Sequence, residues 1–462
     1  MSKFIDRIDE LETLEREYDR DDAAFVVIYG RRRVGKTTLI NHFCEDKRSI
    51  YFLATEENES ENRNSFKNLV SDKFGNELLA SASLTNWEPI FKVIAEESRQ
   101  ERLVLVIDEF QYLCKANPAF SSIMQKIWDG TLQKENVMLI LCGSLINMMT
   151  SQVLNYDSPL YGRRTAQIKL KQIAFSYYHE FDENLSLDNQ ILQYAVTGGV
   201  PKYINLFSKR KNIYTAIKDN ILSTGSFLYA EPEFLLQKEV SEIGSYFSVL
   251  KTIAAGNHKL SKIATSLGVP QSNLTTYLKN LIDLDIVERE IPITEENPEK
   301  SKMGLYMIKD NFISFWFKFV YPNKSLIESG QMKYVEDKIR MNFIDNHVSY
   351  VFEDICRTKV WDLLSEGISF NRVGRWWGAK DVEIDIVAYD SVGTDMIFGE
   401  CKYSKNKKGL SVLESLQSKA KSVNWKKNSR NEYFIIYSKN GFTDDLIKYS
   451  KEHKNVFLKD TK

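Results

Sequence analysis

Four short apolar runs in the first third of the chain predict the strands of a buried sheet. They span residues 23–29, 49–54, 103–110 and 136–144 and are rich in β-branched and aromatic side chains. Runs of this length are typical of buried strands, whereas the segments between them place apolar residues at helical spacing. The pattern therefore predicts an α/β domain built on a parallel sheet.

The segments around these strands carry other expected elements. Leu11, Leu14 and Tyr18 recur at helical spacing among charged residues and predict a surface helix before the first strand. Residues 38–43 predict a helix directly after that strand. The polar run over residues 55–64 predicts a loop or a lid.

Residues 240–310 follow a different pattern, that of compact helices. A short helix is expected over 260–269, a second over 274–281, and two strands over 287–293 and 302–308. This order is similar to that of winged helix-turn-helix domains, many of which bind DNA. The second helix offers polar side chains that could reach bases or phosphates, namely Gln271, Ser272, Asn273, Thr275, Thr276 and Lys279. Because the helix is not strongly basic, docking to protein stays an open alternative.

The last part of the chain returns to mixed helices and strands. The aromatic stretch 312–321 is too short and too charged to span a membrane and predicts a core helix. Residues 350–356 predict a further helix. Residues 382–388 and 396–402 predict two strands joined by a turn.

A glycine-rich stretch directly follows the first predicted strand. Its eight residues have the spacing of a phosphate-binding loop: Gly30, Arg31, Arg32, Arg33, Val34, Gly35, Lys36 and Thr37. Glycine lets backbone amides curl round phosphate oxygens, and the following helix directs free amides and its positive dipole end at the same anion. Lys36 adds an ammonium group, and the Thr37 hydroxyl can bind Mg²⁺. The stretch, continued by Thr38, predicts nucleotide binding, although such a pattern can arise by chance in a surface loop.

Acidic and polar residues stand where the third and fourth strands end. Asp108 and Glu109 follow the third strand, so Asp108 is expected beside the phosphates as a metal ligand and Glu109 as the group that polarises the attacking water. Ser144 follows the fourth strand and is expected either to sense the γ-phosphate or orient the attacking water, or else to cap a helix. Arg163 and Arg164 are candidates for stabilising the transferred phosphate, on the same chain or on a neighbouring subunit, or are ordinary surface arginines.

Composition limits the class of protein. The chain has 462 residues, enough for about three domains of ~150 residues, with 43% hydrophobic and 27% charged residues. The 62 Lys and Arg residues nearly balance the 63 Asp and Glu residues, so any nucleic-acid surface must be a local patch. The five cysteines are scattered without a CxxC pair, which supports neither a disulfide framework nor a zinc site. With no signal-peptide pattern and no long apolar run, we expect a cytoplasmic protein without a membrane partner.

These residues together resemble the archaeal-type ATPase family, a branch of the AAA+-like STAND P-loop ATPases. The resemblance rests on 4–7 with Glu10 and Leu11, the arginine-rich phosphate loop, 107–110, 143–144, 159–164 and 197–203. It implies ATP and Mg²⁺ as cofactors and an ATPase core followed by a small helical lid. Such ATPases commonly act as switches or as homo-oligomers.

The predicted C-terminal strands carry a second candidate site. Side-chain alternation places Glu400 and Lys402 on one face, beside Asp385 of the preceding strand. Asp385 and Glu400 could bind Mg²⁺, with Glu353 completing the shell from the helix, while Lys402 positions a water or offsets phosphate charge. The alternative is an ordinary hairpin with exposed charges.

This region, over about residues 342–457, resembles the PD-(D/E)xK nuclease-like domain that is often fused to archaeal-type ATPases. The proline usual before the first aspartate is replaced here by Ile384, which removes no ligand. Basic and aromatic residues near the site fit either a nucleic-acid surface or a solvated charged face. They are Arg372, Arg375, Trp376, Trp377, Lys380, Lys405, Lys407, Lys408, Lys419, Lys421, Lys426 and Lys427.

The sequence thus predicts an α/β chain in four parts. They are a P-loop ATPase core with a parallel sheet (1–174), a helical lid (175–235), a winged helix-turn-helix (236–322) and an α/β restriction-endonuclease-like domain (323–462). The expected function is ATP hydrolysis by Lys36, Thr37, Asp108 and Glu109, coupled to DNA binding and to hypothetical cleavage by Asp385, Glu400 and Lys402. The alternative is a nucleotide-controlled regulator or scaffold whose terminal domain does not cut.

Overall fold

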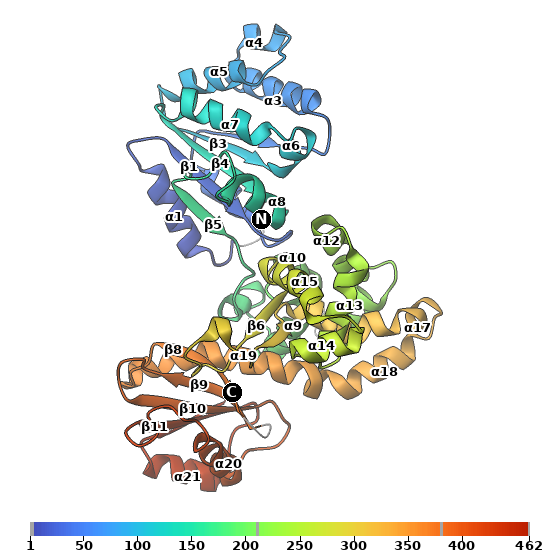
Figure 1. Ribbon diagram of the computed structural model, residues 1–462, viewed down its shortest axis with the longest axis vertical. Coiled ribbons are helices and arrows are strands. Elements are labelled where there is room, and N and C mark those ends of the chain that lie inside the picture. Colours follow the sequence, from blue (N-terminus) through green and yellow to red (C-terminus); the bar gives the residue numbers. More distant parts are fainter. Residues whose placement is uncertain (1–3, 209–211, 379–381, 461–462) are drawn as a thin grey trace. The chain divides into compact units, whose positions relative to one another are not determined.

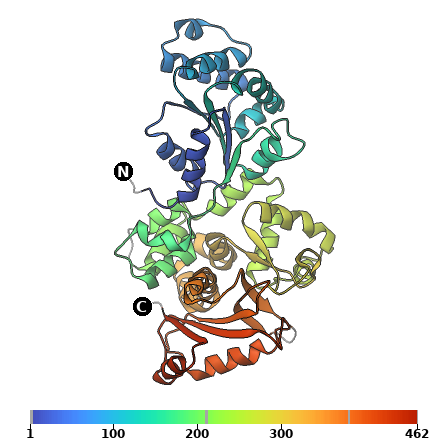
Figure 2. The same cartoon turned by 90° about the vertical axis from the view of Figure 1, so that its left-hand side faces the viewer.

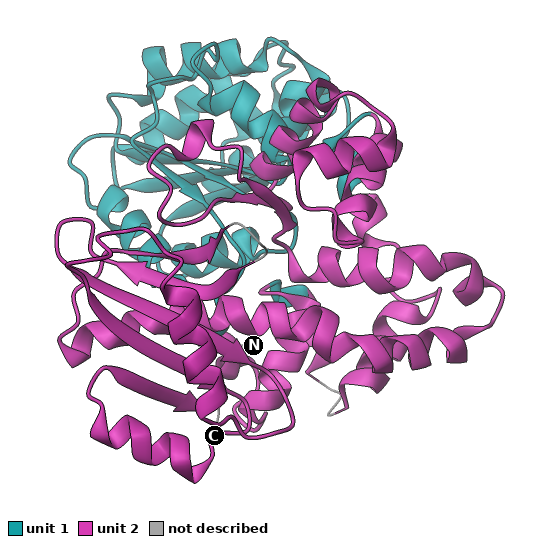
Figure 3. Cartoon of the chain, turned by 60° about the horizontal axis from the view of Figure 1, so that its bottom comes forward, with its two compact units in different colours: residues 1–177, 200–202, 235–241 teal, residues 178–199, 203–234, 242–462 magenta. Residues whose placement is uncertain are grey.

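The computed structural model describes residues 4–208, 212–378 and 382–460, which form two compact units (Figure 3). Unit 1 comprises the chain up to Tyr177 with residues 200–202 and 235–241. Unit 2 comprises residues 178–199, 203–234 and the chain from Glu242 onward. Each unit is described by itself below.

Unit 1 is built on a five-stranded sheet in which all neighbouring strands run parallel. The strands are β1 (Ala24–Tyr29), β2 (Ser49–Leu53), β3 (Leu103–Asp108), β4 (Val137–Gly143) and β5 (Ala166–Lys169). Their spatial order is β2-β3-β4-β1-β5. The four strands predicted from apolar runs are therefore confirmed within one or two residues at each end. β5 has only four residues and was not predicted.

Helices cover both faces of this sheet (Figure 1). Val26 and Ile28 of β1 face the core beneath α1 and α2, and Phe25 and Val27 face the opposite core, so successive side chains alternate between faces. The helical segments of unit 1 are α1 (Ile8–Tyr18), α2 (Lys36–Cys44), α3 (Glu59–Phe74), α4 (Glu77–Ser81), α5 (Glu88–Ser98), α6 (Gln111–Ala116), α7 (Phe120–Ile127), η1 (Trp128–Leu132), α8 (Ile146–Met149) and η2 (Thr150–Leu154).

The loop or lid predicted after β2 is wrong from Glu59 onward, where α3 begins. The side chain of Asn58 caps this helix by accepting a hydrogen bond from the backbone of Glu61 at 2.9 Å. Asn62 is buried and donates to the carbonyl oxygen of Thr55 at 3.1 Å. The polar residues thus bond within the turn and the helix, and a helix forms despite the lack of an apolar stripe at its start.

Unit 2 begins with helices and continues into a two-stranded hairpin. Its first segments, three of which share residues with unit 1, are η3 (Phe175–Phe181), α9 (Leu187–Thr197), α10 (Pro201–Phe207), α11 (Ile213–Ile217), η4 (Lys218–Leu222) and α12 (Glu231–Glu239). The next are α13 (Ile243–Ala254), α14 (Leu260–Leu267), α15 (Gln271–Asp283), β6 (Val287–Glu290), η5 (Pro298–Lys300) and β7 (Leu305–Ile308). The two helices and two strands predicted between residues 260 and 308 are present, and the strands pair antiparallel.

A helical layer follows the hairpin and contains the aromatic stretch. Its segments are α16 (Asn311–Phe315), η6 (Trp316–Val320), η7 (Tyr321–Asn323), α17 (Lys324–Glu328), α18 (Met332–Phe343), η8 (Ile344–Val348), α19 (Ser349–Lys359) and η9 (Val360–Glu366). Trp316 is fully buried and donates its indole N–H to the carbonyl oxygen of Tyr229 at 2.8 Å. The prediction of a core helix over this stretch is confirmed.

The chain ends in a mixed five-stranded sheet of order β12-β11-β10-β9-β8. Its elements are β8 (Arg372–Trp377), β9 (Glu383–Tyr389), β10 (Asp395–Lys402), α20 (Leu410–Ala420), β11 (Asn431–Ser438), α21 (Asp444–Glu452) and β12 (Val456–Asp460). β8, β9 and β10 pair antiparallel, whereas β10, β11 and β12 pair parallel. α20 and α21 cover one face of the sheet, and α19 lies on the other (Figure 2).

The segment after β6 packs along the outer edge of β8. The backbone N–H of Ile293 donates to the carbonyl oxygen of Arg375 at 2.9 Å, and the indole N–H of Trp376 donates to Thr294 Oγ1 at 3.1 Å. A Cβ added at Gly374 would lie 3.0 Å from the Ile293 side chain, so the two segments are in close contact. Across the described ranges, no helix combines the length and the apolar character that crossing a membrane requires.

Candidate active sites

The phosphate loop joins β1 to α2 and depends on two glycines. Gly30 has φ 154°, and a Cβ at this position would lie 2.4 Å from the carbonyl oxygen of Leu170, so no larger residue fits. Gly35 has φ 101° and precedes α2, whose N-terminus has no side-chain cap. The amide groups at this helix end are therefore available to an anion such as a nucleotide phosphate.

Lys36 is buried beneath the loop. Its Nζ donates to the carbonyl oxygens of Gly30 at 2.8 Å and Arg31 at 2.9 Å. Burial lowers the pKa of Lys36, and the negative charges of Glu109 and Asp108 act in the opposite direction. The ammonium group is thus held inside the loop by two weak acceptors, which a phosphate oxygen could replace.

Asp108 ends β3 and is hydrogen-bonded by neutral groups. Its Oδ2 accepts from Thr37 Oγ1 at 3.3 Å and from the hydroxyl group of Tyr51, and its Oδ1 accepts from the backbone N–H of Glu109 at 2.8 Å. The structure therefore brings together Thr37 and Asp108, the two predicted Mg²⁺ ligands of the front site. A carboxylate and a hydroxyl are oxygen donors that suit Mg²⁺.

Glu109 faces Ser144, which follows β4. Glu109 has φ 54°, and its Oε2 accepts hydrogen bonds from Ser144 Oγ at 2.7 Å and from the amide of Gln111. Arg32 approaches the same place, donating to Ser144 Oγ at 3.4 Å and to the Tyr112 hydroxyl at 2.7 Å. Ser144 therefore belongs to this cluster.

The alternative role of Ser144 as a helix cap is wrong. Leu145 is the N-terminal flanking residue of α8, and it forms no side-chain cap. The carboxylate of Glu239 instead accepts from the backbone N–H groups of Ile146 at 3.1 Å and Asn147 at 3.5 Å. Burial raises the pKa of Glu239, while those two N–H groups and the nearby arginines lower it.

Arg163 and Arg164 lie away from the phosphate loop. They precede β5, whose residue Ala166 pairs with Val26 near the start of β1, whereas the loop follows the other end of β1. Arg163 forms a two-bond fork with Asp129, at 2.8 Å and 2.7 Å. The prediction that these arginines contact phosphate on their own chain is wrong, because the parallel register carries them to the opposite sheet edge. A role on a neighbouring subunit stays a prediction.

Arg7 is a functional candidate to which the sequence reasoning gave no role. Its buried guanidinium donates to the carbonyl oxygens of Val34 at 2.9 Å and Lys171 at 2.7 Å and pairs with Glu10 at 3.2 Å. Arg7 thus ties the phosphate loop to the segment after β5. The sequence pattern Phe4–Arg7, which resembles the ATPase family, was the one sign that Arg7 matters. No short stretch of sequence could show that Arg7 contacts Val34, which lies 27 positions away.

The candidate rear site lies on β9 and β10 of unit 2. The antiparallel register that pairs Ile386 with Gly399 continues to place Asp385 opposite Glu400. Asp385 Oδ2 accepts from the backbone N–H of Cys401 at 2.8 Å, and burial, followed by the charge of Glu400, raises the pKa of Asp385. The structure therefore brings the two predicted acids together.

Basic groups neutralise the acids of the rear site. Glu400 pairs with Lys402 at 2.6 Å and with Lys419 at 2.9 Å. Glu353 pairs with Arg375 at 2.7 Å, although burial and then the charge of Asp385 raise the pKa of Glu353. Within the described ranges, no group of three or more His, Cys, Asp or Glu side chains could hold a metal ion. The structure therefore does not support Glu353 as a third Mg²⁺ ligand. Binding of Mg²⁺ by the pair Asp385 and Glu400 stays a prediction.

Part of the expected nucleic-acid surface is buried. Arg375 is 9% exposed because its side chain pairs with Glu290 and Glu353, and Trp376 is 8% exposed because its indole packs against Thr294 in the segment after β6. Their assignment to that surface is wrong, and Lys380 lies outside the described residues. The polar side chains predicted on the second helix, now α15, are exposed: Gln271, Ser272, Asn273, Thr275, Thr276 and Lys279.

The chain matches two protein families over separate residue ranges. Residues 4–207 match a family described as "ATPase domain predominantly from Archaea", and residues 316–415 match one described as "Archaea bacterial proteins of unknown function". The chain is 35% identical over 441 residues to the uncharacterized protein MJECL04 of Methanocaldococcus jannaschii, covering 94% of this chain and 95% of that protein.

Two further similarities are to proteins whose names refer to ATP. The uncharacterized ATP-binding protein MJ0423 of the same organism is 51% identical over 45 residues, which cover 10% of this chain and 76% of that protein. The solved structure of the Walker-type ATPase PABY2304 of Pyrococcus abyssi is 20% identical, with a TM-score of 0.53, and covers 68% of this chain and 96% of that one. At this identity the likeness shows the fold, which is that of P-loop ATPases.

Proposed function

Since the chain belongs to one family with MJECL04 and carries an archaeal-type ATPase domain over residues 4–207, we propose that it is a Mg²⁺-dependent ATP hydrolase whose nucleotide state controls a DNA-directed second half. The observation that carries the first part is one cluster in unit 1. Lys36, Thr37, Asp108, Glu109 and Ser144 converge at the carboxyl ends of β1, β3 and β4. In parallel sheets this edge is where ligands bind.

The residues of this cluster divide the work of phosphoryl transfer. The amides of the loop and the Lys36 ammonium would bind the β- and γ-phosphates, and Thr37 with Asp108 would hold Mg²⁺, which would neutralise charge on those phosphates. Glu109 orients and polarises the attacking water. Ser144, already bonded to Glu109 at 2.7 Å, fixes the direction of that carboxylate.

The second half is proposed to contact DNA through a winged helix-turn-helix over α13–β7. The support is the order of two helices and a hairpin and the exposed polar face of α15. The wing-side segment, however, is packed on β8. DNA contact would therefore come from α15.

The C-terminal part is proposed to be a nuclease-like domain with phosphodiesterase chemistry. Its element order, a helix (α19), three antiparallel strands, a helix (α20) and a parallel strand (β11), fits the PD-(D/E)xK resemblance. Asp385 and Glu400 would hold Mg²⁺, which would activate a water, and Lys402 would offset charge on the scissile phosphate. A non-cutting regulator is the second candidate, favoured by the lysines that already neutralise Glu400.

Two assays test these proposals separately. Purified chain is incubated with single-stranded, double-stranded and branched DNA in Mg²⁺ or Mn²⁺, with Asp385→Ala as the matched variant. Cleavage that disappears in Asp385→Ala supports the nuclease, and no cleavage of any DNA favours the regulator. Phosphate release from ATP, compared with Lys36→Ala, tests the front site, and an inactive wild-type chain would refute ATP hydrolysis.

A further inference from the structure

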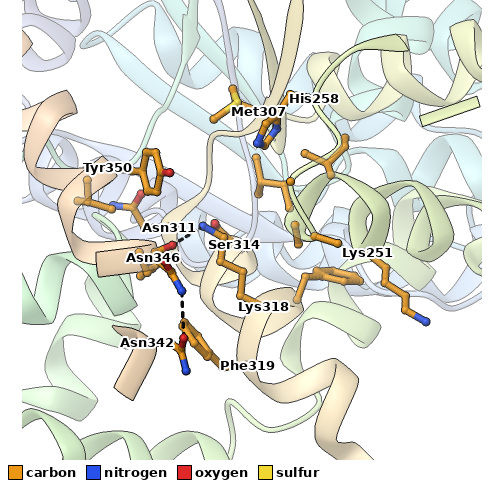
Figure 4. Close-up of a pocket in the computed structure, with 18 of the residues that line it drawn as sticks. Lys251, His258, Met307, Asn311, Ser314, Lys318, Phe319, Asn342, Asn346 and Tyr350 are labelled. Atoms are coloured by element: carbon orange, nitrogen blue, oxygen red, sulfur yellow. Dashed lines mark hydrogen bonds between the residues drawn. The ribbon is translucent and has the colours of Figure 1, made fainter. Parts of the chain in front are cut away.

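A cavity of about 620 Å³ lies in unit 2, and one of its lining residues, Arg375, also pairs with Glu353 of the rear site at 2.7 Å. Helix α13, the hairpin β6–β7, the α16–η6 segment and the η8–α19 segment form its walls (Figure 4). This volume is in the range of small-molecule sites, which are commonly 300–1,000 Å³.

Lys318 is the central cation of this cavity. It comes from η6, and its Nζ donates to the carbonyl oxygen of Asn346 at 2.9 Å and lies 5.3 Å from the centre of the Tyr350 ring. Among the described residues, no carboxylate lies within 4.0 Å of this ammonium group. A half-buried cation without an anionic partner is costly, and an anion supplied from solution would compensate it.

The charges around Lys318 favour an anion over a cation. Lys251 and Lys338 also line the cavity. Of its acids, Glu290 is already paired with Arg357 at 3.5 Å and with Arg375 at 3.4 Å, and Asp354 is paired with Arg357. The remaining one, Glu288, is neutral over part of the physiological range, because burial raises its pKa to about 7.

Neutral polar groups complete the walls. The side chains of Asn311, Ser314 and Asn346 lie near Lys318 (Figure 4). His258 Nδ1 is 3.1 Å from the carbonyl oxygen of Tyr306, and burial lowers the pKa of His258, so the ring is neutral. Burial also lowers the pKa of Lys318 to about 8, which leaves part of its amine unprotonated and reactive.

We propose that this cavity is a binding site for a small phosphate- or carboxylate-bearing molecule whose anion pairs with Lys318. The amide nitrogens of Asn311 and Asn342 each donate one hydrogen bond to a backbone carbonyl oxygen, at 3.2 Å and 2.8 Å, and each carries a second N–H that can donate to the ligand. Phe317 and Phe319 supply apolar contact. The site is distinct from the phosphate loop and does not depend on ATP hydrolysis or DNA cleavage.

The probe for this site is pyridoxal 5′-phosphate, an anionic aldehyde, followed by borohydride. The unprotonated Lys318 amine attacks the aldehyde carbon, water leaves to give an imine, and hydride from borohydride reduces that imine to a stable secondary amine. Peptide mapping by mass spectrometry then gives the labelled lysines of the full chain. We expect Lys318 to be labelled at least about tenfold faster than the exposed Lys333, because its amine is more often unprotonated and the probe's phosphate binds nearby.

Competition identifies the ligand's chemistry. Citrate and inorganic phosphate are added separately, and protection of Lys318 by one of them, with Lys333 unprotected, assigns carboxylate or phosphate preference. Lys318→Met should leave the labelling of other lysines unchanged, and Lys318→Arg should retain anion binding without labelling. Equal labelling of Lys318 and Lys333, or protection by neither anion, would overturn the proposal even if Lys318→Met fails to fold.

Discussion

Two acids of the front site and two acids of the rear site are held in opposite ways. In unit 1, hydroxyl, amide and backbone N–H groups bond Asp108 and Glu109. In unit 2, cationic side chains pair with Glu353 and Glu400. Neutral donors orient a carboxylate but leave its charge, whereas an ammonium or guanidinium group cancels that charge.

This difference decides how readily each site can bind Mg²⁺. At the front site Asp108 accepts hydrogen bonds from the neutral groups of Thr37, Tyr51 and the Glu109 backbone, so Mg²⁺ with a triphosphate displaces no ammonium group from those contacts. At the rear site, Mg²⁺ has to compete with Lys402 and Lys419 for Glu400. Bringing two acids together is therefore not enough to bind a metal ion, because the groups that bond to those acids decide the metal affinity.

The largest expected effect comes from removing the buried cation of the front site. Lys36→Ala should lower the rate of ATP hydrolysis by at least about a thousandfold, because it removes the buried ammonium group that the loop holds for the inner phosphates. Phosphate release under saturating ATP measures it. Lys73→Ala, an exposed lysine of α3, is the matched control. A Lys36→Ala chain that hydrolyses ATP at the wild-type rate would contradict the role given to the front site.

Glu109→Gln should lower turnover by roughly a hundredfold while leaving ATP binding within a few-fold of wild type. The amide can still accept from Ser144 but cannot polarise water as a carboxylate does. Turnover and binding of a fluorescent ATP analogue are measured on the same preparation. Loss of binding together with turnover would instead give Glu109 a structural role.

The third prediction concerns the effect of pH on stability through His347, a buried histidine of unit 2. Its Nε2 lies 2.6 Å from the carbonyl oxygen of Ala195, and burial lowers its pKa to about 3. The unfolded chain, in which a histidine titrates near 6.5, binds more protons than the folded chain below that pH, so acid destabilises the fold. Between about pH 7 and about pH 5 the free energy of unfolding should fall by about 2 kcal/mol from this group.

Urea unfolding of unit 2, followed by tryptophan fluorescence at both pH values, measures this loss. The His347→Gln variant should have lower stability at neutral pH but a flatter pH dependence. His42→Gln, in α2 of unit 1, is the control variant. Equal slopes in wild type and His347→Gln would show that other groups cause the acid sensitivity.

The smallest effect concerns the competing lysines. Lys419→Met should tighten Mn²⁺ binding to the nucleotide-free chain several-fold, since one of two ammonium groups no longer neutralises Glu400. Electron paramagnetic resonance of free Mn²⁺ gives the affinity, with the exposed Lys421→Met as control. Weaker binding in Lys419→Met would contradict the competition between cation and metal.

The sequence predicted the elements whose pattern is local. β1, β2, β3 and β4 follow from continuous apolar runs, and the phosphate loop follows from glycine spacing, so Lys36, Thr37, Asp108 and Glu109 could be placed beforehand. In α3, by contrast, the side-chain cap of Asn58 and the bonds of Asn62 outweigh a polar composition, and no hydrophobic period marks the helix.

What the sequence missed depends on register and on long-range contact. Arg163 seemed close to the phosphates until the pairing of β5 with β1 fixed which sheet edge it occupies. Arg7 reaches Val34 only because α1 packs beneath β1, and Lys318 was hidden within an aromatic helix that was expected to be purely structural. Each of these positions is set by tertiary packing, which a single sequence does not encode in any short window.

The backbone contact between Ile293 and Arg375 affects how shorter fragments of the chain should be designed. β8 is the last strand of its sheet, and its outer edge is covered by residues that precede Pro322. A truncated protein beginning after Pro322 would uncover that strand edge and the Trp376 ring, which invites strand-to-strand association and precipitation. Recombinant fragments of the C-terminal region should therefore start upstream of α13. Each fragment then contains β8 together with the hairpin and the loop that cover its outer edge.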